Sequence, residues 1–311
     1  MTDESQKEEI LINVTPSEVR AALLENGVLQ EVYIERAARR GLISNIYKGR
    51  VLRVLPGMQA AFVDIGLERT AFLHASDISR PGLRENGDEV PGIRELVREG
   101  DEIMVQVVKD PLGNKGARLT TWVTLPSRHL VLLPRSDTVG VSARIEDEDE
   151  RERLRLIVEE LLAERDLDCG AIVRTAAEGC EREALAADLR YSLKLWDVVK
   201  ERFSKSRVKK LVHEDLSLPL RVLRDMVTGD VERVLVDSES DFEAMQEFAQ
   251  TYLPDASPAI ELVKDDPDRR QDQYQHLDRQ YGPTNRVCVQ RPGGAHRPHE
   301  ELVDIIDSKQ K

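Results

Sequence analysis

IYKGRVLRVLPGMQAAFVDIGLERTAFLHASDI, residues 46–78, holds short alternating strands, glycine turns and aromatic side chains, and this order decides the fold. Apolar residues that alternate with polar ones, beginning at Val51, fit β-strands with one buried face. Pro56, Gly57 and Gly66 supply the turn chemistry that joins such runs into a meander. The stretch therefore predicts a small closed β-barrel.

The rings and cations of this barrel suggest a ligand. A five-stranded barrel of the oligonucleotide-binding class presents one strand face to single-stranded nucleic acid, where bases stack on rings and basic side chains follow the phosphates. The candidate rings are Phe62, Phe72, Tyr47 and His74. The candidate cations are Lys48 and Arg50, and then Lys109 and Lys115 in KDPLGNKGARLTT (109–121). An alternative stays open, because Phe62 and Phe72 would also serve to fill the barrel.

Further blocks follow one another along the chain. They are NIYKGRVLRVLPGMQAAFVDIG (45–66), GNKGARLTT (113–121), HLVLLPRS (129–136), GVSARIEDEDER (140–151), GAIVRTAA (170–177) and EREALAADLRYSLKLWDVV (181–199). In this order and spacing the chain resembles the ribonuclease E/G family of bacterial endoribonucleases, from about Glu9 to about Lys264. The resemblance identifies the barrel as an S1 RNA-binding domain. It implies a single-strand endoribonuclease that acts in rRNA or tRNA processing or in mRNA decay.

The resemblance also implies a domain order. A ribonuclease-H-like α/β subdomain is expected to be split by the S1 (OB-fold) barrel and by a mixed α/β segment that senses the RNA 5′ end. The expected parts are a first ribonuclease-H-like part at 1–43, the barrel at 44–125, the 5′-phosphate sensor at 126–205, a second ribonuclease-H-like part at 206–268, and an aberrant or disordered tail at 269–311. The residues themselves show only α/β alternation after residue 206.

Local patterns add elements to this outline. Residues 9–43 predict two or three strands with a turn at Glu25–Gly27. Apolar stripes at helical spacing predict helices near 147–166 and 181–203. We interpret both stripes as parts of the core.

A second candidate site follows from the resemblance, because the family binds a 5′-monophosphate in the mixed segment. Such a pocket needs a fixed guanidinium for the phosphate oxygens and a hydroxyl or backbone amides beside it. By resemblance, Arg174 and Thr175 bind the phosphate, Val131 lines the pocket and Arg144 lies nearby. Ser127 stands where many relatives have glycine, so the resemblance does not carry over one backbone contact. The alternative for Arg174 is a structural ion pair with a carboxylate.

Catalysis in the family depends on Mg²⁺ held by two aspartates in a DNase-I-like subdomain beyond the matched region, since Mg²⁺ takes hard oxygen ligands. No such subdomain is recognisable after about Arg270. The tail fits a frameshifted or mispredicted end, a short terminus, or a diverged remnant in which Asp304 and Asp307 echo metal ligands. His296 and His299 lack HExxH spacing. We assign no catalytic and no metal-binding residue, so a non-catalytic S1-type RNA-binding protein remains the alternative function.

Composition bounds these hypotheses. The chain has 311 residues, 40% of them hydrophobic, and a net charge of −13, which disfavours nonspecific polyanion binding but permits a local basic strip. Cys169, Cys180 and Cys288 have no CxxC spacing, so neither a disulfide framework nor a zinc site is expected. The polar amino terminus and the lack of a long apolar run predict a cytoplasmic protein. The expected partner is single-stranded RNA, preferably 5′-monophosphorylated; family members oligomerise, but we expect that interface to be absent.

Overall fold

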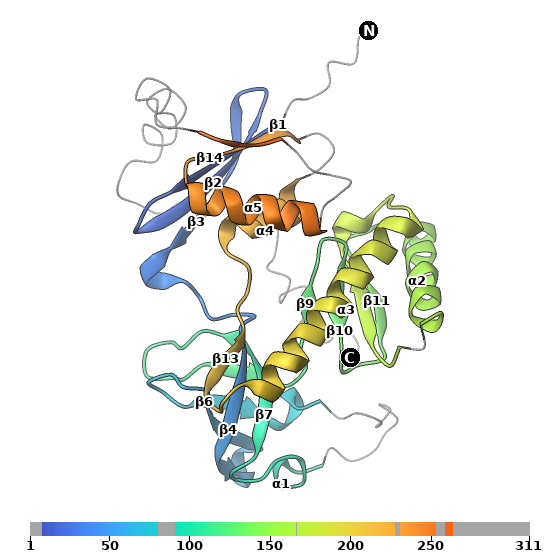
Figure 1. Cartoon of the computed structure of the whole chain (residues 1–311). Helices are drawn as coiled ribbons and strands as arrows, with labels where there is room; N and C mark the ends of the chain where they lie inside the picture. Colours follow the sequence, from blue (N-terminus) through green and yellow to red (C-terminus); the bar gives the residue numbers. More distant parts are fainter. Residues whose placement is uncertain (1–7, 80–90, 166, 228–230, 253–258, 264–311) are drawn as a thin grey trace. The chain divides into compact units, whose positions relative to one another are not determined.

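Two compact units make up the part of the chain that the computed structural model describes, namely residues 8–79, 91–165, 167–227, 231–252 and 259–263 (Figure 1). The α/β unit holds the described residues up to 40 and those from 216 onward. The barrel unit holds the described residues between 41 and 215. The α/β unit is therefore interrupted in sequence by the barrel unit.

The α/β unit is built on a five-stranded sheet of order β15-β14-β1-β2-β3. Its strands are β1 (Glu8–Val14), β2 (Glu18–Glu25), β3 (Val28–Arg36), β14 (Val231–Val236) and β15 (Ala259–Leu262), and its helices are α4 (Leu218–Met226) and α5 (Glu239–Tyr252). The first three strands pair antiparallel, whereas β14 runs parallel to β1 and to β15.

Local chemistry explains the start of this sheet. Asn26 and Gly27 both have positive φ, at 50° and 76°, which is the backbone of a two-residue hairpin turn between β2 and β3. Ile10 and Ile12 on the central strand are fully buried and pack with Leu223 of α4. The predicted turn and strands are present in the structure, and the pairing of β1 with β14 joins the two halves of the unit.

The barrel consists of β4 (Ile46–Leu55), β5 (Ala60–Asp64), β6 (Ala71–His74), β7 (Glu102–Lys109) and β8 (Arg118–Thr120), with the short helix α1 (Ile93–Leu96) beside it. Strand β4 pairs with both β5 and β7, so the sheet closes on itself. Small and branched residues such as Ala61, Val63 and Leu73 fill the interior with no exposed surface. The predicted fold class, an α/β chain with an inserted closed barrel, is confirmed.

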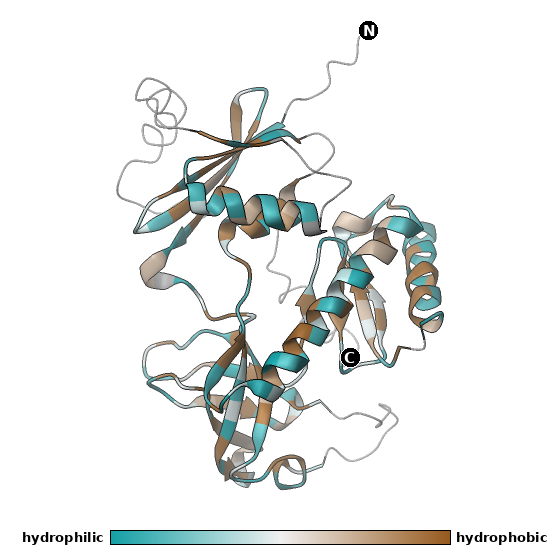
Figure 2. Ribbon diagram, viewed as in Figure 1, coloured by the Kyte–Doolittle hydropathy of each residue, from teal (hydrophilic) through white to brown (hydrophobic). Residues whose placement is uncertain are grey.

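A four-stranded sheet of order β11-β12-β10-β9 completes the barrel unit. Its elements are β9 (Leu125–Pro126), β10 (Leu130–Leu133), β11 (Val139–Val141), β12 (Gly170–Val173), α2 (Glu148–Ala163) and α3 (Arg182–Lys205). Both helices carry apolar residues at helical spacing, with polar residues between them (Figure 2). Leu154 of α2 and Leu189 of α3 are fully buried in one cluster that also contains Ile46 of the barrel. The two predicted stripes are therefore core, and they join this sheet to the barrel.

One predicted boundary is wrong. Residues 206–215 were assigned to the second ribonuclease-H-like part, but β13 (Lys210–His213) pairs antiparallel with β4 of the barrel. Val212 is only 3% exposed, because it packs in the same apolar cluster as Ile46. The return to the α/β unit accordingly lies near residue 216.

Two other sequence predictions concern membrane-spanning segments and the tail of the chain. Among the helices that the structure describes, none is long and apolar enough to span a bilayer. The predicted tail at 269–311 lies outside the described residues.

Candidate nucleic-acid interface

A row of side chains crosses the outer face of the barrel, one from each strand. In strand order, the cross-strand row is Arg53, Phe62, Phe72, Arg118 and Lys109, and each residue is paired in register with the next. Directly paired residues in a sheet lie on the same face. The two rings are half-buried and the three cations are exposed. The barrel therefore presents an apolar centre flanked on both sides by positive charge.

The aromatic centre of the row extends to a third ring. The Phe62 and Phe72 centroids lie 6.3 Å apart with the rings at 68°, and the Phe72 and His74 centroids lie 6.5 Å apart at 29°. Both geometries lie within the range that aromatic pairs prefer. Since Val63 and Leu73 point inward, Phe62 and Phe72 do not fill the barrel.

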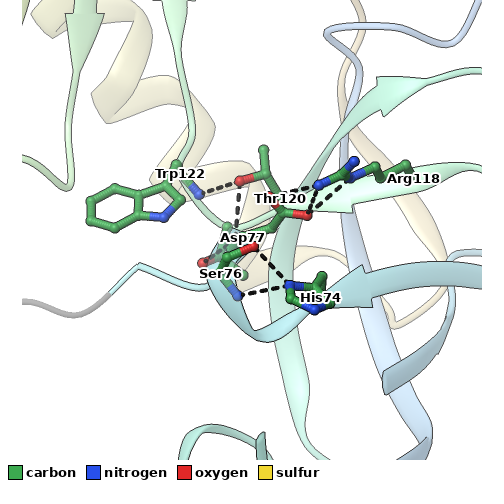
Figure 3. Close-up of polar contacts among 7 residues, drawn as sticks. His74, Ser76, Asp77, Arg118, Thr120 and Trp122 are labelled. Atoms are coloured by element: carbon green, nitrogen blue, oxygen red, sulfur yellow. Dashed lines mark hydrogen bonds and ion pairs between the residues drawn. The ribbon is translucent and has the colours of Figure 1, made fainter. Parts of the chain in front are cut away.

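His74 is held in one orientation by Ser76 (Figure 3). The backbone N–H of Ser76 donates to His74 Nδ1 at 3.2 Å, and the Ser76 hydroxyl lies 2.7 Å from the same nitrogen. Because a backbone N–H only donates, Nδ1 accepts and the proton of the neutral ring sits on Nε2. The ring thus presents a hydrogen-bond donor beside Phe72.

Arg118 is fixed by Asp77 (Figure 3). Its Nε donates to Asp77 Oδ2 at 3.0 Å and its Nη2 to Oδ1 at 3.4 Å. The Asp77 carbonyl in turn accepts from the Thr120 hydroxyl at 3.0 Å and from the Thr121 N–H at 2.8 Å. Several hydrogen bonds therefore set the plane of the guanidinium next to the rings. Sequence reasoning missed Arg118 and Arg53 as site residues; their pairing in register is the signal that finds them.

Two residues predicted for this surface lie elsewhere. Tyr47 is 7% exposed inside the barrel, and burial raises its pKa. The ammonium of Lys48 lies 5.0 Å from the centroid of the Phe203 ring and 3.3 Å from Glu102. Side chains alternate between the two faces of β4, and Tyr47 occupies an inward position. Lys48 is held by Phe203, which lies near the end of α3. Tyr47 is therefore a core residue and Lys48 is already engaged.

The remaining predicted cations lie near the row. Arg50 pairs with Glu102 at 3.1 Å. Lys115 is exposed at the tip of the β7–β8 hairpin, where its backbone N–H donates to the Leu112 carbonyl at 2.9 Å. Leu112 itself is 80% exposed. The hairpin tip therefore places Lys115 beyond the strand ends rather than within the row.

The predicted phosphate-binding residues meet at one edge of the four-stranded sheet. Strands β11 and β12 are parallel, so the residues that follow them lie side by side. Ser142 and Arg144 follow β11, and Arg174 and Thr175 follow β12. The Thr175 and Ser142 hydroxyl oxygens are 3.1 Å apart. The structure thus brings two hydroxyls together beside the backbone of Arg174.

Arg174 is oriented by the turn between β9 and β10. Its Nη1 donates to the carbonyl oxygens of Ser127, at 2.6 Å, and Arg128, at 3.2 Å. Its backbone N–H donates to the His129 carbonyl at 2.8 Å. A guanidinium held by several contacts loses less entropy when it binds an anion.

Asp188 of α3 fixes that turn from the other side. Its Oδ2 accepts from the Ser127 hydroxyl at 2.6 Å and from the N–H groups of His129 and Leu130, both at 2.9 Å. Ser127 is 1% exposed, so its hydroxyl serves an internal contact. Burial lowers the pKa of His129, and the nearby Asp188 carboxylate opposes this shift. The turn is therefore a rigid link between α3 and Arg174.

Val131, which is predicted to line the pocket, has a buried side chain. It shares a sheet face with Ile172, its cross-strand partner, and with Leu133. Its side chain is 3% exposed. Any contact that Val131 makes with a phosphate would therefore come from its backbone.

Comparison with known proteins identifies the family. The model of the Ribonuclease E/G family matches residues 124–287, which is more than half of the chain. The chain belongs to the ribonuclease E/G family. The model of the S1 RNA binding domain matches residues 43–121, which contain the barrel and the cross-strand row.

Individual relatives agree with this assignment. Ribonuclease G of Salmonella typhimurium (strain SL1344) is 53% identical over 258 residues, which cover 81% of this chain and 52% of that protein. Ribonuclease E of Escherichia coli (strain K12) is 37% identical over 260 residues, which cover 81% and 24%. The chain thus spans about half the length of its ribonuclease G relatives. A solved a/eIF2alpha–aDim2p–rRNA complex from Pyrococcus horikoshii OT3 aligns with a TM-score of only 0.21 at 13% identity, over 68% of this chain and 95% of that one.

A divalent metal is the cofactor that membership of the ribonuclease E/G family suggests. Within the described ranges, no group of three or more His, Cys, Asp or Glu side chains is arranged to hold a metal ion. The predicted remnant carboxylates Asp304 and Asp307, and His296 and His299, lie outside those ranges. We therefore assign no metal ligand and no hydrolytic step to the described residues.

Proposed function

We propose that this ribonuclease E/G family chain binds single-stranded RNA on the cross-strand row and reads the 5′ phosphate at Arg174 and Thr175. It is the recognition part of a Mg²⁺-dependent endoribonuclease that acts in rRNA or tRNA processing or in mRNA decay. The single observation that carries the proposal is the row itself, in which two rings stand between cations on one face of an S1 barrel.

The chemistry of the row suits an unpaired strand. Bases that are not stacked in a duplex can stack on Phe62 and Phe72, and a ring contact tolerates any base. Arg53 on one side and Lys109 on the other can follow the phosphates. A duplex would bury its base faces and leave the two rings without a partner.

Cleavage and binding are separated by one assay. The purified chain is mixed with a fluorescein-labelled, 5′-monophosphorylated single-stranded RNA and Mg²⁺, and both anisotropy and product length are read. Cleavage that EDTA abolishes would support the nuclease. Binding without cleavage would agree with a recognition part that needs a separate catalytic part, and no binding would reject the proposal.

The 5′-phosphate pocket makes a prediction about Arg174. Arg174→Ala should weaken binding of 5′-monophosphorylated RNA by about 1.5–3 kcal/mol, the usual contribution of a hydrogen bond to a charged group, and should leave 5′-hydroxyl RNA unchanged. Fluorescence anisotropy with the two RNAs measures the difference. Lys194→Ala, which removes an exposed cation from α3, is the control and should change neither affinity. Equal affinity of the unmutated protein for the two RNA ends would remove the sensor assignment.

A further inference from the structure

A basic segment covers the last residues of α3, the loop that follows and the first residue of β13. This basic turn, residues 200–210 with the sequence KERFSKSRVKK, contains six Lys or Arg residues and one Glu, in a chain whose net charge is −13. Phosphate binding needs a local concentration of cations rather than a basic chain. The basic turn provides one such concentration.

The backbone of the basic turn is held against the barrel. The Lys209 N–H donates to the Lys48 carbonyl at 2.6 Å, and Lys209 has the left-handed φ of 65°. Gly66 lies so close that an added Cβ would stand 2.3 Å from the Lys209 carbonyl oxygen. Phe203 packs over the Lys48 ammonium. The cations of the turn are therefore presented from a fixed position.

Several of these cations have no acidic partner. Lys200 pairs with Asp197, Lys205 with Glu201 and Lys209 with Asp64. By contrast, Arg202, Arg207 and Lys210 are exposed and form no ion pair with any described residue. An exposed cation without a partner can bind a phosphate without first giving up an internal contact.

The basic turn continues the face that carries the rings. Strand β4 pairs with β7 along one edge, and β5 and β13 lie end to end along the other. Phe62 and Asp64 are two residues apart on β5 and point to the same face, a step of about 7 Å. Asp64 Oδ2 then lies 2.7 Å from Lys209 Nζ. The rings and the turn therefore meet at the end of β5.

Acidic groups on this path are already neutralised. Glu102 accepts from Arg50 at 3.1 Å and lies 3.3 Å from the Lys48 ammonium. Asp64 is bound by Lys209 as described. Asp64, where the rings and the turn meet, and Glu102, across β4 from it, consequently do not repel a phosphate as free charges would.

We propose that the basic turn is a second RNA contact, which binds the phosphates of the strand as it leaves the rings past Asp64. The inference rests on the proposed RNA binding by the cross-strand row. Arg207 and Lys210 are the residues that make the contact, and the ligand is the sugar-phosphate backbone rather than a particular base.

The test compares two matched double variants. Arg207→Gln with Lys210→Gln removes one Arg and one Lys from the turn, and Arg190→Gln with Lys194→Gln removes the same charges from exposed positions earlier on α3. Each is titrated with unstructured RNAs of about 4 and about 12 nucleotides, near the limits for such barrels, over a range of salt concentrations. Circular dichroism verifies that both variants are folded.

The expected result depends on RNA length. With the longer RNA, the turn variant should lower the slope of log K against log salt by about 1.4, since each phosphate contact to a single strand contributes about 0.7. With the shorter RNA neither variant should differ from the unmutated protein. An equal loss in both double variants would overturn the inference. So would unchanged binding of the longer RNA by the turn variant, which would point to an acidic protein as the ligand of the turn.

The two proposals fail differently in this experiment. If the unmutated protein binds neither RNA, RNA binding by the row is wrong and the inference falls with it. If the short RNA binds and the turn variant is indistinguishable from the control on the long RNA, the row stands and only the inference is rejected.

Discussion

Replacing Phe62 and Phe72 together by alanine is expected to abolish most RNA binding, because each stacked base contact contributes about 1–3 kcal/mol. Replacing only one of the two rings by alanine should then lower the affinity for RNA roughly 5- to 150-fold. The two rings contact one another, at 6.3 Å between centroids, so the double change should not equal the sum of the single ones. Anisotropy titrations of all three variants with one single-stranded RNA measure these effects.

Two controls separate stacking from charge and from folding. Phe62→Tyr with Phe72→Tyr retains both rings and should retain affinity. The alanine variant keeps Arg53, Lys109 and Arg118, so its residual binding should show an unchanged salt slope. Full affinity in the alanine variant, with the protein still folded, would show that RNA does not use this face.

Replacing Asp188 by alanine should lower the free energy of unfolding. The change leaves the N–H groups of His129 and Leu130 without their acceptor, whereas the Ser127 hydroxyl can still donate to the Leu130 carbonyl at 2.9 Å. Leu130 is buried, and each unsatisfied buried donor costs about 1–3 kcal/mol. We expect a decrease of about 2–5 kcal/mol in the free energy of unfolding, which a urea titration measures.

The same change also bears on the 5′-phosphate site. Arg174 donates to carbonyls of the turn that Asp188 holds, so loosening the turn should also remove the preference for 5′-monophosphorylated RNA. Asp188→Asn keeps a carbonyl oxygen as acceptor and should lose much less stability. If the asparagine and alanine variants are equally stable, the three hydrogen bonds do not hold the turn.

Much of the fold could be predicted from local sequence. Alternation and turn residues predicted the barrel strands, and apolar stripes predicted α2 and α3, because both signals come from residues close together in the chain. The turn at Asn26 and Gly27 is predictable for the same reason, since two left-handed residues in succession suit few residue types.

Pairing between distant segments was not predictable in this way. Nothing in the sequence of Lys210–His213 states that β4 is its partner, so this strand was assigned to the wrong unit. Tyr47 and Phe62 both looked like surface rings, and only the register of the closed barrel places one inside and the other outside. Arg53 and Arg118 became candidates for the same reason, because their cross-strand neighbours are rings.

No sequence pattern predicts that Asp188 and Arg174 are linked through hydrogen bonds to the same turn. A carboxylate on a helix is ordinarily solvated, and only its three hydrogen bonds to the turn reveal its role. The predicted pocket residues were drawn from a resemblance, which names contacts with a ligand but not the groups that support them.

The split α/β unit also has a consequence for synthesis on the ribosome. The Asn13 side chain of β1 donates a hydrogen bond to Asp237, which follows β14 and lies 224 residues later in the chain. At about 5–20 residues per second, roughly 11–45 s pass between the appearance of the two partners. Throughout that time the β1 edge of the nascent β1–β2–β3 meander, which carries the apolar Ile10 and Ile12, lacks its partner β14. This edge is a site for pairing with other chains, so we expect the nascent protein to depend on chaperones for longer than its size suggests.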